Sequence, residues 1–286
     1  MTLYATVADA LSAMSAGSGS SATDQAVLQG NLRAVSRRVD RLFASNRPYF
    51  APYIEQRQMR VDGQHVNSQD NTFRLDWPIL AISAASIGTT TLVVGTDIEL
   101  WPDVTSPYRY LHNMNGQYWY DYCTNSYRPL TLKVTGTWGY HRDWANAWLD
   151  VTTLSAAIAT ASATSITVTD IDGTDAYGRS PWISAGALLK IDSEYLEVTA
   201  VNTTTNIATV RRGVNGSTAA THSNGATVSV YQVEEDLREV VARQAGFKYA
   251  RRGAYETATI ANLTTTQFPS DLLAELQNTL AGYAYE

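Results

Sequence analysis

Cysteine, charge and long apolar runs are all scarce in this sequence. Cys123 is the one cysteine among 286 residues, so no intrachain disulfide can form, and a thiol-only chain fits synthesis in a reducing cytoplasm. The first residues lack the basic segment and apolar core of a signal peptide. No apolar run approaches the ~20 residues that span a bilayer. We therefore expect neither a disulfide-stapled fold nor a membrane partner.

Charged residues make up only 17% of the chain, and they leave a net charge of −6. A protein that grips nucleic acid usually carries a basic face, and the total gives no sign of one. The low share of charged residues is made up by Ser, Thr, Asn and Gly, which favour turns and strand surfaces. Hydrophobic residues reach 44%, which suits a folded protein, and the 17 Tyr and 7 Trp can serve both cores and large intersubunit contacts.

Motifs for chemistry are equally scarce. No pair of histidines has metal-ligand spacing, and there is neither a Gly-x-Ser-x-Gly elbow nor a Walker loop. Asp170-x-Asp172-Gly173-x-Asp175 resembles a calcium loop, but Pro181 and Trp182 occupy the region of the late glutamate, so a plain turn is preferred. Carboxylates distant in sequence can still meet in a fold. The histidines whose spacing was compared are His65, His112, His141 and His222. We expect no catalytic residue, no metal and no cofactor.

The first zone of the chain, to about Arg47, is predicted to be helical. Thr6 can cap a short helix, and residues 15–21 form a flexible break. A second helix begins near Thr23 and Asp24 and is expected to bury one stripe of side chains. That stripe consists of Leu28, Leu32, Val35, Val39 and Leu42.

The second helix also carries a possible basic face. Arg33, Arg37 and Arg41 follow one another at a spacing of four residues, and Arg38 lies beside them. They could form a ridge for DNA or for an acidic partner. We favour the interpretation that this is an ordinary solvated helix face, because Asp24 and Asp40 reduce its net positive charge.

The zone from about Tyr53 to Val230 reads as β structure throughout. Its first part holds strands at Thr89–Val94 and Leu130–Gly136. A smaller unit at about 151–231 has short strands with Asn-Gly and Asp-Gly turns, which favours a small barrel or sandwich. Its strands are expected at Ser165–Thr169, Leu188–Ile191, Tyr195–Val198, Ile207–Val210 and Thr227–Val230.

Helix returns after residue 231. Acidic residues open a helix at Glu234 and basic residues close it at Lys248, in keeping with the helix dipole. Pro269 begins a last helix, whose apolar face either joins the chain's own core or docks on a neighbouring subunit or partner. The candidate partner-binding residues of this arm are Phe268, Leu272, Leu273, Leu276 and Leu280.

Together these zones predict an α+β fold, in which a helical frame from both chain ends packs with a β-rich middle that contains an inserted small β-barrel or sandwich domain. The predicted divisions are 1–150 for the N-terminal helices and β-rich part of the frame, 151–231 for the inserted domain, and 232–286 for the C-terminal helices and docking arm.

The frame resembles the head-tail connector, or adaptor, proteins of long-tailed bacteriophages. The resemblance is carried by the order of four segments: a short N-terminal helix, a helix ending in Arg33–Phe43, a strand ending in Thr135–Tyr140, and a late helix with Tyr249–Gly253. In that family a strand leading into Gly-x-Trp-Gly precedes a helix that packs beside the N-terminal helices.

Residues Ile191–Val198 and Val210–His222 are similar to a small β module of phage neck and tail proteins. Within them, Arg211 and Arg212 are expected to pair with Glu194 or Glu197 across the sheet. His222 is expected to be a structural hydrogen-bonding residue.

The resemblance implies a structural, non-enzymatic virion protein, made in the host cytoplasm and located in the head-tail neck. Such adaptors form a ring, typically a dodecamer, that binds the portal protein, meets the next neck, stopper or tail protein, and lets DNA pass without sequence-specific contacts. The alternative is a β-rich carbohydrate-binding or baseplate protein, in which exposed rings stack on sugars. The candidate rings are Tyr108, Tyr110, Tyr118, Trp119 and Tyr120.

Overall fold

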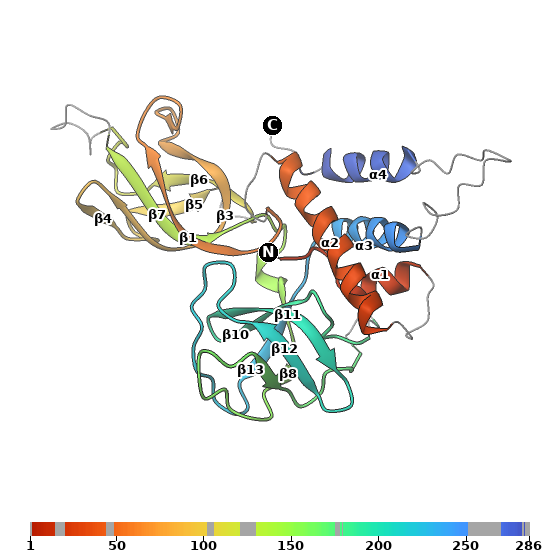
Figure 1. Ribbon diagram of the computed structural model, residues 1–286. Coiled ribbons are helices and arrows are strands. Elements are labelled where there is room, and N and C mark those ends of the chain that lie inside the picture. The colour runs from red at the N-terminus through yellow and green to blue at the C-terminus, as the bar shows by residue number, and fades with distance from the viewer. Residues whose placement is uncertain are drawn as a thin grey trace. The chain divides into compact units, whose positions relative to one another are not determined.

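The computed structural model describes residues 2–14, 21–43, 49–101, 106–120, 130–174, 178, 180–250, 270–281 and 283, with the backbone alone for 270–273, 275 and 276. The chain separates into two compact units: one joins Met1–Pro48 to Ala147–Glu286, and the other is Tyr49–Asn146. Helices and antiparallel sheets occur together, so the chain belongs to the α+β class (Figure 1).

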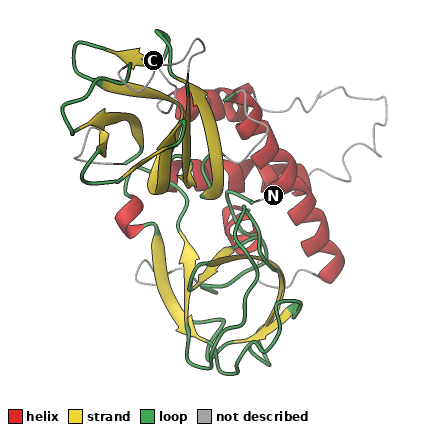
Figure 2. Ribbon diagram, turned by 90° about the vertical axis from the view of Figure 1, so that its left-hand side faces the viewer, coloured by secondary structure: helices red, strands yellow, loops and turns green. Residues whose placement is uncertain are grey.

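The first unit gathers its helices into one group, in which α3 contacts α1, α2 and α4 (Figure 1, Figure 2). Thr6 caps α1 and Ser21 caps α2, each in a capping box that the sequence signals through an acid three residues later. The cap of α1 was predicted, whereas Ser21 was assigned to the flexible break. The bounds are α1 (Val7–Ala13), α2 (Ala22–Leu42), α3 (Glu235–Ala250) and α4 (Ser270–Ala281).

The buried stripe of α2 ends earlier than predicted. Leu28, Leu32, Val35 and Val39 are fully buried, but Leu42 is 51% exposed. Asp40 takes the buried position beside Val39, and its carboxylate accepts the hydroxyl hydrogen of Tyr4. A polar group is tolerated there because it has a hydrogen-bond partner.

The N-terminal segment ties the helices to the β structure of the same unit. Tyr4 donates its backbone N–H to Ser36 of α2 at 3.1 Å, and Val7 donates its backbone N–H to the carbonyl of Ala185 at 3.0 Å. Asn215 donates its amide to the hydroxyl of Thr2 at 2.7 Å. Residues 2–5 are all buried, and nothing in their composition signals this.

The β structure of this unit is a six-stranded antiparallel sheet, within the described residues, in the order β8-β13-β10-β11-β12-β9. Trp148 of β8 and Tyr231 of β13 are cross-strand partners, so this β segment begins and ends at neighbouring points. A bridge between Leu154 and Val168 also joins the continuations of the two edge strands. The strands are β8 (Trp148–Thr153), β9 (Ser165–Thr167), β10 (Leu188–Ile191), β11 (Glu194–Asn202), β12 (Ile207–Arg211) and β13 (Thr227–Tyr231).

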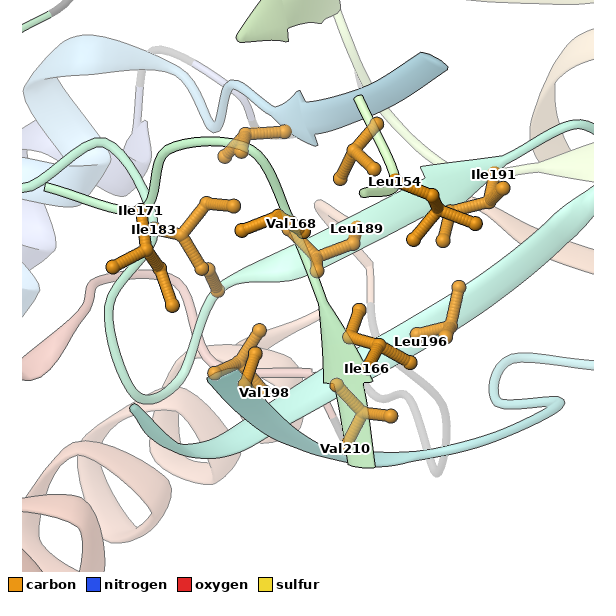
Figure 3. Close-up of a cluster of buried hydrophobic side chains, with 14 of the residues drawn as sticks. Leu154, Ile166, Val168, Ile171, Ile183, Leu189, Ile191, Leu196, Val198 and Val210 are labelled. Atoms are coloured by element: carbon orange, nitrogen blue, oxygen red, sulfur yellow. The ribbon is translucent and has the colours of Figure 1, made fainter. Parts of the chain in front are cut away.

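Branched aliphatic side chains from several strands of this sheet and from the loops between them form one core (Figure 3). Ile166, Leu189 and Leu196 come from three different strands and are buried together. Small β-branched and leucine side chains suit such a core, because they pack densely on a pleated surface.

The second unit is a separate sheet of seven strands, within the described residues, in the order β1-β7-β3-β6-β5, with β2 and β4 paired to β3. Along β7, buried and half-buried residues alternate, as the sequence predicted. The strand expected at Thr89–Val94 is shorter, because Val93 accepts turn hydrogen bonds and Val94 forms only an isolated bridge to Ile98. The strands are β1 (Tyr53–Arg60), β2 (Val66–Asn67), β3 (Thr72–Ile87), β4 (Thr90–Leu92), β5 (Ile98–Trp101), β6 (Tyr108–Asn113) and β7 (Thr131–Trp138).

The glycines of the Thr135–Tyr140 motif permit close backbone contacts in this unit. A Cβ on Gly136 would lie 2.2 Å from the carbonyl oxygen of Ala81 in β3, and one on Gly139 would lie 2.8 Å from the carbonyl oxygen of Ala51. Trp138 between them is 1% exposed and donates its ring N–H to the carbonyl of Glu55 at 3.1 Å. The motif therefore has a structural explanation inside the sheet.

Candidate functional site

The densest polar cluster of the described residues surrounds Glu194, at the turn between β10 and β11. Its carboxylate accepts two hydrogen bonds of 2.6 Å from Arg212, one from Nε and one from Nη2. It also accepts the backbone N–H groups of Gly213 and Ala220, each at 3.0 Å. His222 Nε2 lies 2.8 Å from the same carboxylate, and its Nδ1 lies 2.7 Å from Asp192.

This cluster is buried and fully engaged. Glu194, Arg212 and His222 have side chains that are 0%, 5% and 1% exposed. Burial raises the pKa of Glu194, but the hydrogen bonds from Arg212, His222 and the two backbone groups outweigh it and lower that pKa to about 2. The remaining guanidinium hydrogens bind the carbonyls of Thr160, Ala163 and Ala220.

Such a cluster acts as a clamp rather than as an acid–base centre. It joins the β10–β11 turn to loops at 160–163 and 212–222. The hydrogen-bonding groups of Glu194, Arg212 and His222 all contact one another or the protein, so none is left to bind a substrate. The predicted pairings are confirmed: Arg212 binds Glu194, and Arg211 binds Glu197 at 2.8 Å. His222 has the predicted hydrogen-bonding position.

The predicted basic face of α2 is split by the fold. Arg33 lies 3.9 Å from the buried Glu197 of β11, so it belongs with the β structure. Arg37, Arg38 and Arg41 are exposed. Lys248 of α3 joins them: partial burial and the nearby charge of Arg38 both lower its pKa. Sequence reasoning missed Lys248 because only the packing of α2 on α3 brings it there.

Of the candidate docking residues in the last helix, only Leu280 has a described side chain. It is 5% exposed, and Tyr283 beyond it is 1% exposed and donates its hydroxyl to Asp236 of α3. Phe268 lies outside the described residues, and the side chains of Leu272, Leu273 and Leu276 do too. The part of α4 that is described therefore packs on the chain's own α3.

The candidate sugar-stacking rings differ in their exposure to solvent. Trp119 is buried, donates its ring N–H to the carbonyl of Asn71 at 2.9 Å, and packs against Phe73. Tyr118 and Tyr120 are 56% and 41% exposed. Tyr108 and Tyr110 are half-buried.

A hollow of about 250 Å³ lies in the first unit, between the N-terminal segment, the loop before β10 and the start of α3. Trp182 and Tyr231 form part of its wall. Its charged lining is already paired, because Arg238 lies 3.0 Å from Asp9. Nothing in this arrangement resembles a nucleophile with its base.

The aspartates of the calcium-like segment make a turn. Asp170 accepts the backbone N–H groups of Asp172 and Gly173, each at 3.2 Å, which is the geometry of an Asx turn. Asp175 lies outside the described residues. Among the residues that the structure describes, no group of three or more acids, histidines or cysteines could hold a metal ion.

Comparisons with family models, with curated proteins and with solved structures gave no match. Within the described residues, no helix combines the length and apolar character needed to cross a membrane.

Proposed function

We propose that the chain is a structural, non-enzymatic protein of a tailed-phage virion: a ring-forming adaptor that joins the portal to the neck or tail and extends the DNA channel. One observation carries the proposal. Helix α3 follows the β-rich segments yet contacts α1 and α2 from the other end of the sequence. This is the packing that the resemblance to connector proteins implies for the late helix.

The finer fold assignment belongs to the same proposal. In it, the helices of both chain ends form the frame, and 151–231 is a small barrel inserted between the frame strand and the frame helix. The pairing of Trp148 with Tyr231 supports an insertion, because a domain whose ends are adjacent can enter a loop without moving its flanks. The bridge between Leu154 and Val168 supports closure of the sheet. The division into 1–150, 151–231 and 232–286 remains a prediction.

The partners follow from the proposal: a homo-oligomeric ring of about a dozen copies, the portal protein, the next neck or stopper protein, and DNA that passes without sequence-specific contacts. An acidic protein along a channel would let DNA slide, because few phosphates would be held. The net charge of −6 supports this.

Native mass spectrometry and electron microscopy of the purified chain, with and without the portal, test the proposal. We expect closed rings, formed either alone or on the portal. A chain that stays monomeric and ignores the portal contradicts the adaptor function. Binding to polysaccharides through Tyr118 and Tyr120, without ring formation, would favour the carbohydrate-binding alternative.

A further inference from the structure

Three arginines lie on the last turns of α2, and the charge of one of them, Arg38, reaches Lys248 of α3. We call these four cations the basic end: Arg37, Arg38, Arg41 and Lys248. The three arginines are exposed on the last turns of α2, and Lys248 is half-buried on the last turn of α3. Arg38 and Lys248 are close enough for the arginine charge to lower the lysine pKa, after the larger effect of burial. Like charges at this distance repel, so an anionic partner would stabilise them.

Asp40, the acid nearest in sequence to Arg38 and Arg41, is turned to the inner side of α2. Asp40 is 4% exposed and its carboxylate accepts the hydroxyl of Tyr4 on the inner side of α2. Within the described part of the chain, Arg38 and Arg41 form no ion pair. The basic end is therefore an outward-facing positive patch on a chain whose net charge is −6.

DNA is the less suitable partner for so small a patch. Proteins that hold duplex DNA neutralise about 6–10 phosphates, and their affinity falls steeply with salt. Four cations on an acidic chain would bind phosphate weakly, and acids elsewhere would oppose it. A protein surface of opposite charge fits the size of the patch better.

The same unit presents an acidic surface at the other end of α3. Four of the six residues from Glu234 to Glu239 are acidic. The side chains of Glu235 and Glu239 are 76% and 67% exposed. Arg238, the one cation among these six residues, already contacts Asp9 and Glu235. Arg243, one turn further on, lies 3.5 Å from Glu239, so four acids here face two cations and the surface keeps a negative balance. Nine residues of helix separate Glu239 from Lys248, or about 14 Å, so the two patches are distinct.

We propose that the basic end of one copy docks on the acidic start of α3 in the next copy. The proposal rests on the ring-forming function above and names the surfaces of its subunit contact. Two different patches on each copy make a head-to-tail contact, which closes into a ring when the rotation between copies divides a full turn. Exposed ion pairs contribute little affinity each, so the charges select orientation and partner.

The outer face of α2 can also accept a close neighbour. Leu42 beside Arg41 is 51% exposed and Val27 is 38% exposed, so apolar area is available for burial. Gly30 and Ala34, the exposed positions between Val27 and the arginines, are small, and a Cβ on Gly30 would meet nothing within 4 Å. A neighbouring element can therefore approach the helix backbone here without a bulky side chain in its way.

Charge reversal in full-length chains tests the contact. One variant carries Arg38→Glu and Arg41→Glu, and a second carries Glu235→Arg and Glu239→Arg. Each variant gives both patches the same sign of charge. Each variant on its own should therefore self-associate with an affinity about tenfold or more below that of the wild type. An equimolar mixture of the two should assemble again, because each reversed patch then meets a patch of opposite sign on the other variant. Arg60→Glu with Arg74→Glu is the matched control, since it changes the net charge equally in the other unit.

Sedimentation velocity and native mass spectrometry read the outcome, and circular dichroism checks that each variant is folded. If a reversed variant is unfolded, Glu235→Gln with Glu239→Gln or Arg38→Gln with Arg41→Gln replaces it, with the same expected loss. Loss by each variant and recovery in the mixture support the proposal. If the wild-type chain and both variants all form rings, the proposed contact is wrong but the ring-forming function stands. If the wild-type chain never assembles, both the contact and the ring-forming function are wrong. DNA binding that depends on Arg38 and Arg41, with assembly unchanged, would overturn it in favour of a nucleic-acid site.

Discussion

Arg212 and Glu194 form a two-bond ion pair in the interior of the first unit, with Nε and Nη2 each 2.6 Å from a carboxylate oxygen. Parallel N–H···O bonds of this kind are the strongest polar contacts that side chains make. Here the pair is nearly inaccessible to solvent, and every hydrogen of the guanidinium has an acceptor. It reinforces loops that are otherwise joined by a single backbone bridge between Ile158 and His222 within the described residues.

The first prediction concerns this pair. Arg212→Ala should lower the free energy of unfolding of the first unit by about 3–5 kcal/mol, because it leaves a buried carboxylate without its countercharge. Arg211→Ala is the matched control. Arg211 is adjacent in sequence and also binds a glutamate, but its own side chain is 58% exposed, and without it Glu197 keeps Arg33 at 3.9 Å as a second cation. The loss should therefore be about 1 kcal/mol or less. Urea unfolding followed by circular dichroism measures both, and equal losses would contradict a clamp at Arg212.

The second prediction concerns acid. The folded pKa of Glu194, about 2, is below its unfolded value of 4.5, so its ionised form contributes stability above the unfolded pKa. That contribution is lost as the pH falls through the window from about 4.5 to about 2. Glu194→Gln should be less stable at neutral pH, and its stability should fall less steeply across this window. Urea midpoints measured at several pH values compare the two chains, and parallel curves would show that Glu194 has an ordinary pKa.

The third prediction separates two glycines. Gly136→Ala should destabilise the second unit by about 1–3 kcal/mol or more, because its Cβ would lie 2.2 Å from a backbone oxygen that cannot easily move. Gly30→Ala places the same methyl group on an exposed helix position with nothing within 4 Å. It should stabilise α2 by up to about 1 kcal/mol through helix propensity. Calorimetry of the two variants should shift melting in opposite directions, and a neutral Gly136→Ala would contradict the close contact of β3 with β7.

Local patterns predicted much of the fold. The cap at Thr6, the alternation along β7 and the short strands after residue 151 all follow from spacing and turn chemistry, and the structure has each of them. The pairing of Arg211 with Glu197 also followed, since these residues are cross-strand partners of opposite charge.

Features that depend on tertiary packing could not be predicted in the same way. The burial of residues 2–5 arises from contacts with residues as distant as Asn215. Leu42 fits a helical stripe, but no neighbour covers it at the end of α2 within the described residues. In the sequence Lys248 marks only the end of a predicted helix; its place near Arg38 depends on the packing of α3 on α2. Sequence spacing carries no information about such partners.

The last prediction concerns the final helix, which is short enough to be marginal alone in water. Truncation after Thr266 should lower the melting temperature of the first unit, because it removes two side chains buried on the chain's own helices, Leu280 and Tyr283. Burial of side chains of this size contributes roughly 1.5–3 kcal/mol each. Tyr283→Ala should reproduce part of the loss, since the hydroxyl bond to Asp236 is lost as well, whereas Gln277→Ala on the exposed side of α4 should be neutral.

The docking prediction for the same helix is tested by a different readout. A chain with Leu272→Ser and Leu276→Ser, compared with wild type, should keep its melting temperature but lose binding to the portal if these leucines face a partner. If instead the double variant melts lower by as much as the truncation, its leucines belong to the chain's own core, and the docking arm is excluded. Calorimetry and a pull-down with purified portal give the two measurements on the same preparations. Because Leu280 is already buried in the chain, the docking prediction rests on the leucines nearer the start of the helix.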